Sequence, residues 1–311
     1  MLAPYVEAHA GGPMLDLCVR SLDLYDGWIT ALRGEGAAID YARIGTLEIA
    51  LSPEGAATLR GGHGDWLDAP AVAALVPQLG PTAGALRNDR HGYADARQLA
   101  HALAQSAARH GAQFVTARVE SINRRDNGFR IVTGPVDAAL EASTVVLAAG
   151  AWTNQIHGAR TPPVRPVRGQ LLHVNWQHGP LPSILWGPDC YIVPLSGGAR
   201  GLLVGATVED AGFDERTTDD GVNGLFEAAH RLLPILRKAD VVEARVGLRP
   251  VTPDELPVLG DDPAEPGIIH ASGHYRNGVL LAPITAKLIG DLVIDGRRDA
   301  CLDHFGVDRF D

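Results

Sequence analysis

"STVVLAAGAWT", residues 143–153, runs from branched apolar side chains into small ones and then a glycine. A short apolar run of this kind is typical of a buried strand in the centre of a parallel sheet, because both faces of such a strand are covered. The carboxyl ends of these strands border a ligand crevice. We therefore expect a layered α/β unit here, with a binding site close to Gly150.

The neighbouring segments have helical and strand periodicities. "GIIHASG", residues 267–273, resembles the first strand in character and leads into an apolar helix expected over 279–294. Apolar residues at helical spacing predict an amphipathic helix over 14–33. Another helix is expected over 96–110, because Asp95 is a suitable N-cap and a glycine follows the last helical residue.

Several other segments alternate between apolar and polar residues and are separated by Gly and Pro, which predicts antiparallel strands. Residues 112–134 are expected to form strand, turn and strand, with the turn at Asp126-Asn127-Gly128. A helix is expected around 224–236. The other expected strands are GTLEIAL (45–51), RGQLLHVNW (168–176), CYIVPLS (190–196), GLLVGATVE (201–209) and VVEARVGLRP (241–250).

This order of segments predicts two interleaved domains in a mixed α/β chain. Residues 43–90 and 166–246 are expected to form one sheet-rich domain. Residues 1–42, 91–165 and 247–311 are expected to form the layered α/β domain. A length of 311 residues agrees with about two domains.

Composition excludes several classes of protein. Hydrophobic residues make up 46% and charged residues 21%, as in an ordinary globular protein. The formal charge of −10 argues against a nucleic-acid partner. The longest apolar stretch contains Lys287 and Asp291, so we expect no membrane span, and the start "MLAPYVEAHAGG" does not resemble a signal peptide. Three separated cysteines favour free thiols and a cytoplasmic location.

Motifs for several enzyme classes are missing. The sequence has no phosphate-binding loop of the Gly-x-x-x-x-Gly-Lys type, no His-Glu-x-x-His and no Gly-x-Ser-x-Gly. Its twelve histidines show no metal-binding spacing, so no metal is expected. The dinucleotide motif Gly-x-Gly-x-x-Gly is also missing, since "GGHGDWL" and "SGGARGLL" lack its spacing and do not follow a buried strand.

Three segments carry candidate site residues. Arg249, in "GLRPVTPDELPVLG", follows a strand, and its planar fork suits a carboxylate; the alternative is a surface arginine or a structural ion pair. Tyr191, in "DCYIVP", has a phenol that can donate to the same anion, although a lone tyrosine in a strand is more often core. In "GHYRNG", residues 273–278, glycines around Arg276 permit close backbone approach to a flat ligand.

Taken in order, seven segments resemble the FAD-dependent amine oxidases related to D-amino-acid oxidase, and most of all the glycine oxidases of thiamine biosynthesis, the ThiO type. The resemblance covers essentially the whole chain. The segments are MLAPYVEAHAGGPMLDL (1–17), VVLAAGAWT (145–153), RPVRGQLL (165–172), DCYIVP (189–194), GATVEDAGFDERTT (205–218), GLRPVTPDELPVLG (247–260) and GHYRNGVLLAP (273–283).

The resemblance implies a flavoprotein with a discontinuous FAD-binding domain, the layered α/β domain, and a substrate domain, the sheet-rich one. Arg249 would clamp the substrate carboxylate, Tyr191 would add its hydroxyl, and Arg276 would lie at the same pocket. No side chain is expected to act as a catalytic acid or base. The residues implied to contact FAD are Val119, Gly150, Ala151, His274, Tyr275, Arg276, Asn277, Gly278, Val279 and Leu280.

The implied reaction is oxidative deamination of a small amino acid or amine. Hydride would pass from the α-carbon to flavin, oxygen would give peroxide, and the imine would supply thiamine thiazole synthesis. A D-amino-acid or sarcosine-type oxidase or dehydrogenase is one alternative, and a non-catalytic remnant that acts as a binding module is another. The sequence leaves open the amine, the electron acceptor and whether the chain forms a homo-oligomer.

One departure from the family concerns the cofactor. Members of the family begin with a strand, a Gly-x-Gly-x-x-Gly turn and a helix, whereas this sequence begins at the point that follows those parts. We therefore expect an FAD-binding domain without its first βαβ unit, and weak retention of FAD.

Overall fold

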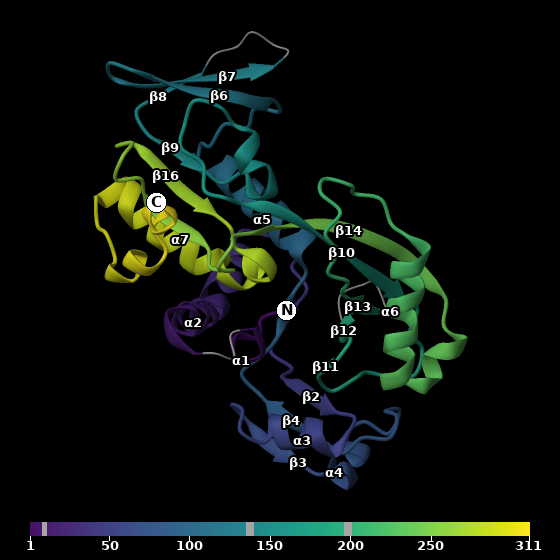
Figure 1. Ribbon diagram of the computed structural model, residues 1–311. Coiled ribbons are helices and arrows are strands. Elements are labelled where there is room, and N and C mark those ends of the chain that lie inside the picture. Colours follow the sequence, from purple (N-terminus) through teal and green to yellow (C-terminus); the bar gives the residue numbers. More distant parts are fainter. Residues whose placement is uncertain (8–10, 135–139, 196–200) are drawn as a thin grey trace.

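The structure is a computed structural model that describes residues 1–7, 11–134, 140–195 and 201–311. It confirms the mixed α/β class. One group of elements surrounds an eight-stranded sheet, and two long strands, β10 and β14, connect it in space to a second group of helices and small sheets (Figure 1). In order across the large sheet, the strands are β14 (Val241–Val251), β10 (Arg165–Val174), β13 (Gly201–Gly205), β12 (Tyr191–Leu195), β11 (Ile184–Trp186), β2 (Thr46–Ala50), β4 (Gly84–Asn88) and β3 (Asp65–Leu67).

The large sheet is antiparallel except between β11 and β2. The alternating segments thus form the antiparallel strands predicted for them, although β13 ends at Gly205 and Ser196 lies outside the described residues. Strand β10 pairs with β14 in a register that sets Val167 opposite Arg249 and Gly169 opposite Gly247. This register fixes which side chains of the two long strands are neighbours.

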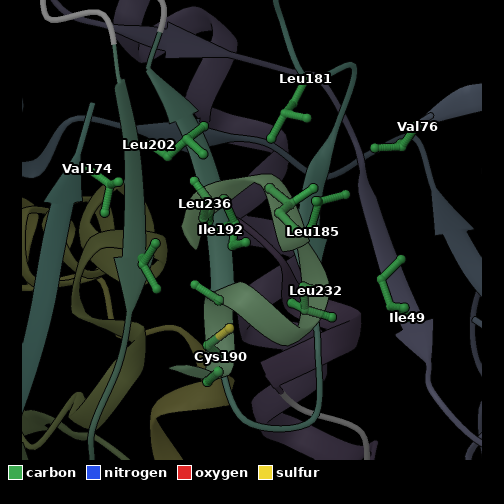
Figure 2. Close-up of a cluster of buried hydrophobic side chains, with 14 of the residues drawn as sticks. Ile49, Val76, Val174, Leu181, Leu185, Cys190, Ile192, Leu202, Leu232 and Leu236 are labelled. Carbon is green, nitrogen blue, oxygen red and sulfur yellow. The ribbon is translucent and has the colours of Figure 1, made fainter. Parts of the chain in front are cut away.

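Helix α6 (Asp219–Leu232) covers one face of the large sheet. Thr218 caps the helix by accepting from the backbone N–H of Gly221. In Figure 2, Leu232 of α6 and Leu236 beyond it lie among Leu185 of β11 and Ile192 of β12. Burying each such side chain stabilises the fold by roughly 1.5–3 kcal/mol, so this core fixes α6 against the sheet.

Helices α2 (Gly12–Gly34) and α7 (Gly278–Asp295) pack together in the second group, as the apolar periodicities predicted. The Ser21 hydroxyl donates to the carbonyl of Leu280 over 2.6 Å. Residues 275–295 are long and apolar enough to cross a membrane by length and composition alone. However, α7 buries Leu281, Ile284 and Leu288 against other elements of the fold, as the core helix of a globular domain does.

A three-stranded sheet lies beside α7, in the order β15 (Val258–Asp261), β16 (Ile268–Ser272) and β9 (Val145–Leu147). Strand β9 runs parallel to β16, as expected. The expectation that β9 is a buried central strand is wrong for the described residues, where it lies at the edge of the sheet and Val146 is 40% exposed. No described strand pairs with its outer side, so only one of its edges is covered.

The segment after helix α5 (Ala96–Arg109) differs in part from its prediction. Asp95 caps α5 by accepting from Gln98 N, as expected. Strands β6 (Arg118–Arg125) and β7 (Gly128–Gly134) form the predicted hairpin, with β8 (Leu140–Ala142) beside them. Residues 112–117 are not a strand, however, because they pair with no described neighbour, and Phe114 is 64% exposed.

Shorter elements complete the chain, and its division into two domains stays a prediction. They are α1 (Pro4–Glu7), β1 (Tyr41–Ala42), α3 (Pro53–Leu59), α4 (Ala69–Leu75), β5 (Tyr93–Ala94), η1 (Gly150–Gln155), η2 (Pro234–Lys238), η3 (Tyr275–Asn277), η4 (Ala300–His304) and η5 (Val307–Phe310).

Candidate functional site

Tyr191, Arg249 and Arg276 all line one cavity of about 320 Å³, which we call the clamp cavity. They come from β12, β14 and η3, so the fold brings together three segments that are far apart in the sequence. A second cavity of about 420 Å³ shares these three residues and extends along β14 past Arg245. The site therefore has a polar end and room beyond it.

Arg249 is a largely buried positive charge at the clamp cavity. Its Nη1 donates to the carbonyl oxygen of Thr207 over 2.9 Å, and burial lowers the pKa of its guanidinium. Within the described ranges, no carboxylate forms an ion pair with it, which argues against the structural ion pair considered above. Because arginine cannot shed its charge in a protein, this guanidinium requires an anion.

Two glycines make room for the side chains of Arg249 and Tyr191. A Cβ on Gly169 of β10 would lie 2.2 Å from both Nη1 and Nη2 of Arg249. A Cβ on Gly205 of β13 would lie 2.3 Å from the hydroxyl of Tyr191. Real side chains do not approach so closely, so only glycine lets the guanidinium and the phenol occupy these positions.

Tyr191 contributes a neutral donor. Burial raises the pKa of its phenol, so the hydroxyl keeps its proton at neutral pH. Its ring stacks on Trp186 with 5.6 Å between ring centroids, which fixes the direction of the hydroxyl. Tyr191 and Arg249 therefore offer N–H and O–H donors to one anion.

A polar network on β10 and the chain after β13 supports Arg249 from behind. Gln170 N donates to Thr207 Oγ1 over 2.8 Å, and Gln170 Nε2 donates to Glu209 Oε1 over 2.7 Å. Arg168, largely buried, donates from Nε to Glu209 Oε2 over 2.9 Å. These bonds hold the Thr207 carbonyl in place, and that carbonyl in turn orients the guanidinium of Arg249.

Arg276 faces a partner that sequence reasoning missed. Its Nη2 lies 3.3 Å from Glu7 Oε2, and its guanidinium lies 5.4 Å from the centroid of the Tyr275 ring. The Arg276 side chain is 39% exposed, whereas that of Glu7 is only 10% exposed. No spacing in the sequence connects residues 7 and 276, so only the fold reveals this pair.

The loop that carries Arg276 has an unusual backbone. Gly273 has a φ of +73° and Tyr275 a φ of +47°, and together they turn the chain sharply between β16 and α7. Burial lowers the pKa of His274 to about 4, so its ring is neutral, and its Nε2 lies 3.0 Å from Thr285 Oγ1. Asn277 Oδ1 is buried without a hydrogen-bond partner, and no side chain caps the first turn of α7.

Gly150 and Ala151 lie next to this loop. Thr153 Oγ1 donates to the Gly150 carbonyl over 2.7 Å and lies 3.0 Å from Ser272 Oγ, which connects η1 to the end of β16. Gly150 has a φ of +56°, and an added Cβ would meet no atom within 4 Å. Gly150 and Ala151, two of the residues predicted to contact FAD, therefore border the 273–278 loop, which carries several of the others.

The remaining predicted residues are more dispersed. Tyr275 and Val279 line the larger cavity, and Gly278 begins α7. Leu280 is fully buried in the core beside α2, so only its backbone is open to a role in binding. Val119, on β6, packs against the Ile122 and Phe129 cluster rather than lining either cavity. Their contacts with FAD stay predictions.

Comparison with known proteins identifies the family. Residues 1–292 match the family model described as FAD dependent oxidoreductase. The chain belongs to the FAD-dependent oxidoreductase family. It is 36% identical over 319 residues to the bifunctional protein ThiO/ThiG of Synechocystis, a match that covers 100% of this chain and 47% of that protein. The chain thus spans about half of the length of this bifunctional relative.

A glycine oxidase gives both a sequence and a structural match. The enzyme of Geobacillus kaustophilus is 34% identical over 313 residues, which cover 94% of this chain and 81% of that one. Its crystal structure superposes with a TM-score of 0.89 at 32% identity and covers 98% of this chain and 86% of that chain. The mixed fold predicted from the sequence is therefore that of a solved member of the family.

The residues around the 273–278 loop fit the ring end of FAD, the cofactor of this family. The orphaned Asn277 Oδ1 is a buried acceptor, and the uncapped start of α7 presents backbone N–H donors. The open Gly150 and the lack of close contacts at Gly278 leave the backbone accessible to a flat polar group. For the pyrophosphate, by contrast, the sequence offers no Gly-x-Gly-x-x-Gly turn.

Proposed function

We propose that this protein catalyses the FAD-dependent oxidative deamination of a small amino acid, as a glycine-oxidase-like enzyme. One observation carries the proposal. Arg249 is a largely desolvated guanidinium with no described carboxylate partner, and it faces a cavity beside the Tyr191 hydroxyl. A carboxylate is the anion whose shape matches that fork, and every α-amino acid has one.

The protein's part in the reaction is to bind and orient. Arg249 would receive the two carboxylate oxygens, and Tyr191 would donate to one of them, which fixes the direction of the α-carbon. FAD, when bound, supplies the acceptor for the hydride that leaves the α-carbon, and oxygen would take up the electrons as peroxide. No acid or base side chain is needed for the clamp to serve this chemistry.

The proposed role in thiamine thiazole synthesis rests on the relatives. The Synechocystis protein is named for ThiO and ThiG together, and the Geobacillus protein is named a glycine oxidase. An imine made by this chain would then be the product passed to thiazole synthesis. Glycine is the substrate that this comparison favours.

A larger amine is the second candidate, and the 420 Å³ cavity favours it. This cavity continues from Arg249 past Leu171 and Tyr93 to Arg245, which is more room than glycine fills. A D-amino acid or an N-substituted glycine would place its extra atoms there. Comparing kcat/KM for glycine, sarcosine and D-alanine separates the two candidates.

The proposal is tested with Arg249→Ala and a carboxylate that cannot be oxidised at nitrogen, such as glycolate, in the presence of excess FAD. Losing a charge-assisted pair at a desolvated site costs about 2–5 kcal/mol, so glycolate binding should weaken by about 30-fold or more and KM should rise. Arg276→Ala should act more weakly, because a partly solvated charge contributes less.

Arg87→Ala is the matched control, because Arg87 forms an exposed ion pair with Asp89 at 2.6 Å, outside both cavities. It should leave glycolate binding unchanged. Unchanged affinity in Arg249→Ala would refute the clamp, and with it the proposed substrate class.

A further inference from the structure

Glu7 places a carboxylate at the clamp cavity, at the end of α1. Its side chain is nine-tenths buried, and its Oε2 has no hydrogen-bond partner, although Arg276 Nη2 lies 3.3 Å away. A carboxylate oxygen buried in this way requires a donor, because leaving it unpaired costs free energy. The structure thus holds a carboxylate that is ion-paired with Arg276 and has one buried oxygen, Oε2, that accepts no hydrogen bond.

The other acid at the clamp cavity is already committed. Asp189 pairs with Arg231 at 2.7 Å, and this pair is exposed at the surface. Arg276 is shared between Glu7 and the ring of Tyr275. Glu7 is therefore the acid of this cavity with capacity left for a ligand.

The charges of the cavity are complementary to a zwitterion. Arg249 offers donors to an anion, and Glu7 offers a buried acceptor to a cation in the same 320 Å³ space. An α-amino acid carries its carboxylate and its amino group on adjacent atoms of one carbon. Such a ligand would give Arg249 an anion and the buried Glu7 Oε2 a hydrogen-bond donor at once, whereas a carboxylate without a second polar group satisfies only Arg249.

We propose that Glu7 recognises the amino group of the substrate and so makes the site selective for amino acids over other small carboxylates. This inference rests on the proposed function, because it takes Arg249 as the carboxylate clamp. The amino group would donate an N–H to the unpartnered Oε2, and Arg276 would keep the Glu7 carboxylate turned toward the cavity. Glu7 is thus a specificity-determining residue, and no proton transfer is assigned to it.

The test uses two ligands of the same shape that cannot be oxidised. 2-Aminoisobutyrate has no hydrogen on its α-carbon, so it cannot give up hydride, and 2-hydroxyisobutyrate replaces its amino group with a hydroxyl. Calorimetry on the full chain with excess FAD gives a dissociation constant for each. Glu7→Gln keeps the shape of the side chain but removes its charge. The hydroxyl of 2-hydroxyisobutyrate can also donate to Glu7, so the ratio of the two constants reports how much more the charged amino group gains from the carboxylate than a neutral donor does.

We expect Glu7→Gln to weaken 2-aminoisobutyrate about 10- to 100-fold, the range for one charge-assisted hydrogen bond, and to weaken 2-hydroxyisobutyrate, whose donor is neutral, by a factor that is smaller by about threefold or more. Glu7→Asp keeps the charge and should retain the preference for the amino ligand. The same comparison is made in protein that carries Arg276→Ala. Adding Glu7→Gln to this variant should again lower the preference for the amino ligand, which shows that the effect of Glu7 does not depend on its contact with Arg276.

Equal weakening of both ligands would show that Glu7 only positions Arg276, and would overturn the inference while leaving the clamp intact. An unchanged ratio in a variant whose melting temperature matches the wild type would overturn it as well. A failure of the proposed function gives a different result. If Arg249 is not the carboxylate clamp, Arg249→Ala leaves the binding of 2-hydroxyisobutyrate unchanged.

Discussion

The most specific consequence of the site concerns Gly169, a residue that need not touch the substrate. In Gly169→Ala the new Cβ would lie 2.2 Å from Nη1 and Nη2 of Arg249 and 2.3 Å from its Cζ. Favourable contacts between such atoms lie near 3.5–4 Å, so the guanidinium must move by about 1 Å or more. That displacement breaks the 2.9 Å bond to the Thr207 carbonyl and turns the fork away from the ligand.

The expected effect falls on binding rather than on folding. A misdirected charge-assisted pair costs about 2–5 kcal/mol, which corresponds to about 30- to 4000-fold in the dissociation constant of glycolate. The side chain that moves is long and flexible, and alanine is favoured over glycine in a strand by about 0.5–1 kcal/mol. The melting temperature should therefore change little.

Gly247→Ala is the matched control. Gly247 lies directly opposite Gly169 across β10 and β14, yet its added Cβ would meet no atom within 4 Å. The same chemical change in the same strand pair should then leave the glycolate constant close to that of the wild type. Calorimetry with excess FAD measures both variants, and wild-type affinity in Gly169→Ala would show that Arg249 does not hold the ligand from its position in the structure.

Two further predictions concern a buried acid outside the site and the phenol at the clamp cavity. Burial raises the pKa of Glu48 to about 7 from its ordinary 4.5, so the stability present below about pH 4.5 should be lost as the pH rises to about 7, by up to about 3 kcal/mol. Glu48→Gln should remove that loss in urea unfolding at pH 5 and pH 8, and an identical pH dependence in both proteins would refute this assignment. Tyr191→Phe should weaken glycolate about 10- to 100-fold through one lost hydrogen bond to the charged carboxylate, and an unchanged constant would exclude the phenol from the site.

Local patterns in the sequence were sufficient for the long helices α2, α5 and α7, but not for the short helices α3 and α4, and the helix expected around 224–236 begins earlier, at Asp219, and ends at Leu232. The spacing of apolar residues predicts α2, and Asp95 marks the start of α5, because a helix face and an N-cap are properties of neighbouring residues. The edge position of β9 was not predictable in this way. Whether a strand is central depends on which segments pair with it, and no described strand pairs with its outer side.

Only some residues of the candidate site could be predicted, because local patterns do not show which segments meet in the fold. Arg249 and Tyr191 stand in recognisable segments, and the fold brings them to one cavity. A glycine inside a strand, such as Gly169, indicates that another group lies close to the backbone there. Only the pairing of β10 with β14 shows that this group is the guanidinium of Arg249. Glu7 has no local pattern at all, because its contact with Arg276 arises from tertiary packing alone.

The most direct test of the central claim is anaerobic reduction of the flavin by glycine. Protein mixed with excess FAD is exposed to glycine without oxygen, and the visible flavin band is followed until air is admitted. We predict that the band bleaches, that it recovers with release of peroxide, and that Arg249→Ala slows bleaching at low glycine concentration. A flavin band that persists with glycine, sarcosine and D-alanine alike would contradict the assignment of this chain as an amino-acid oxidase.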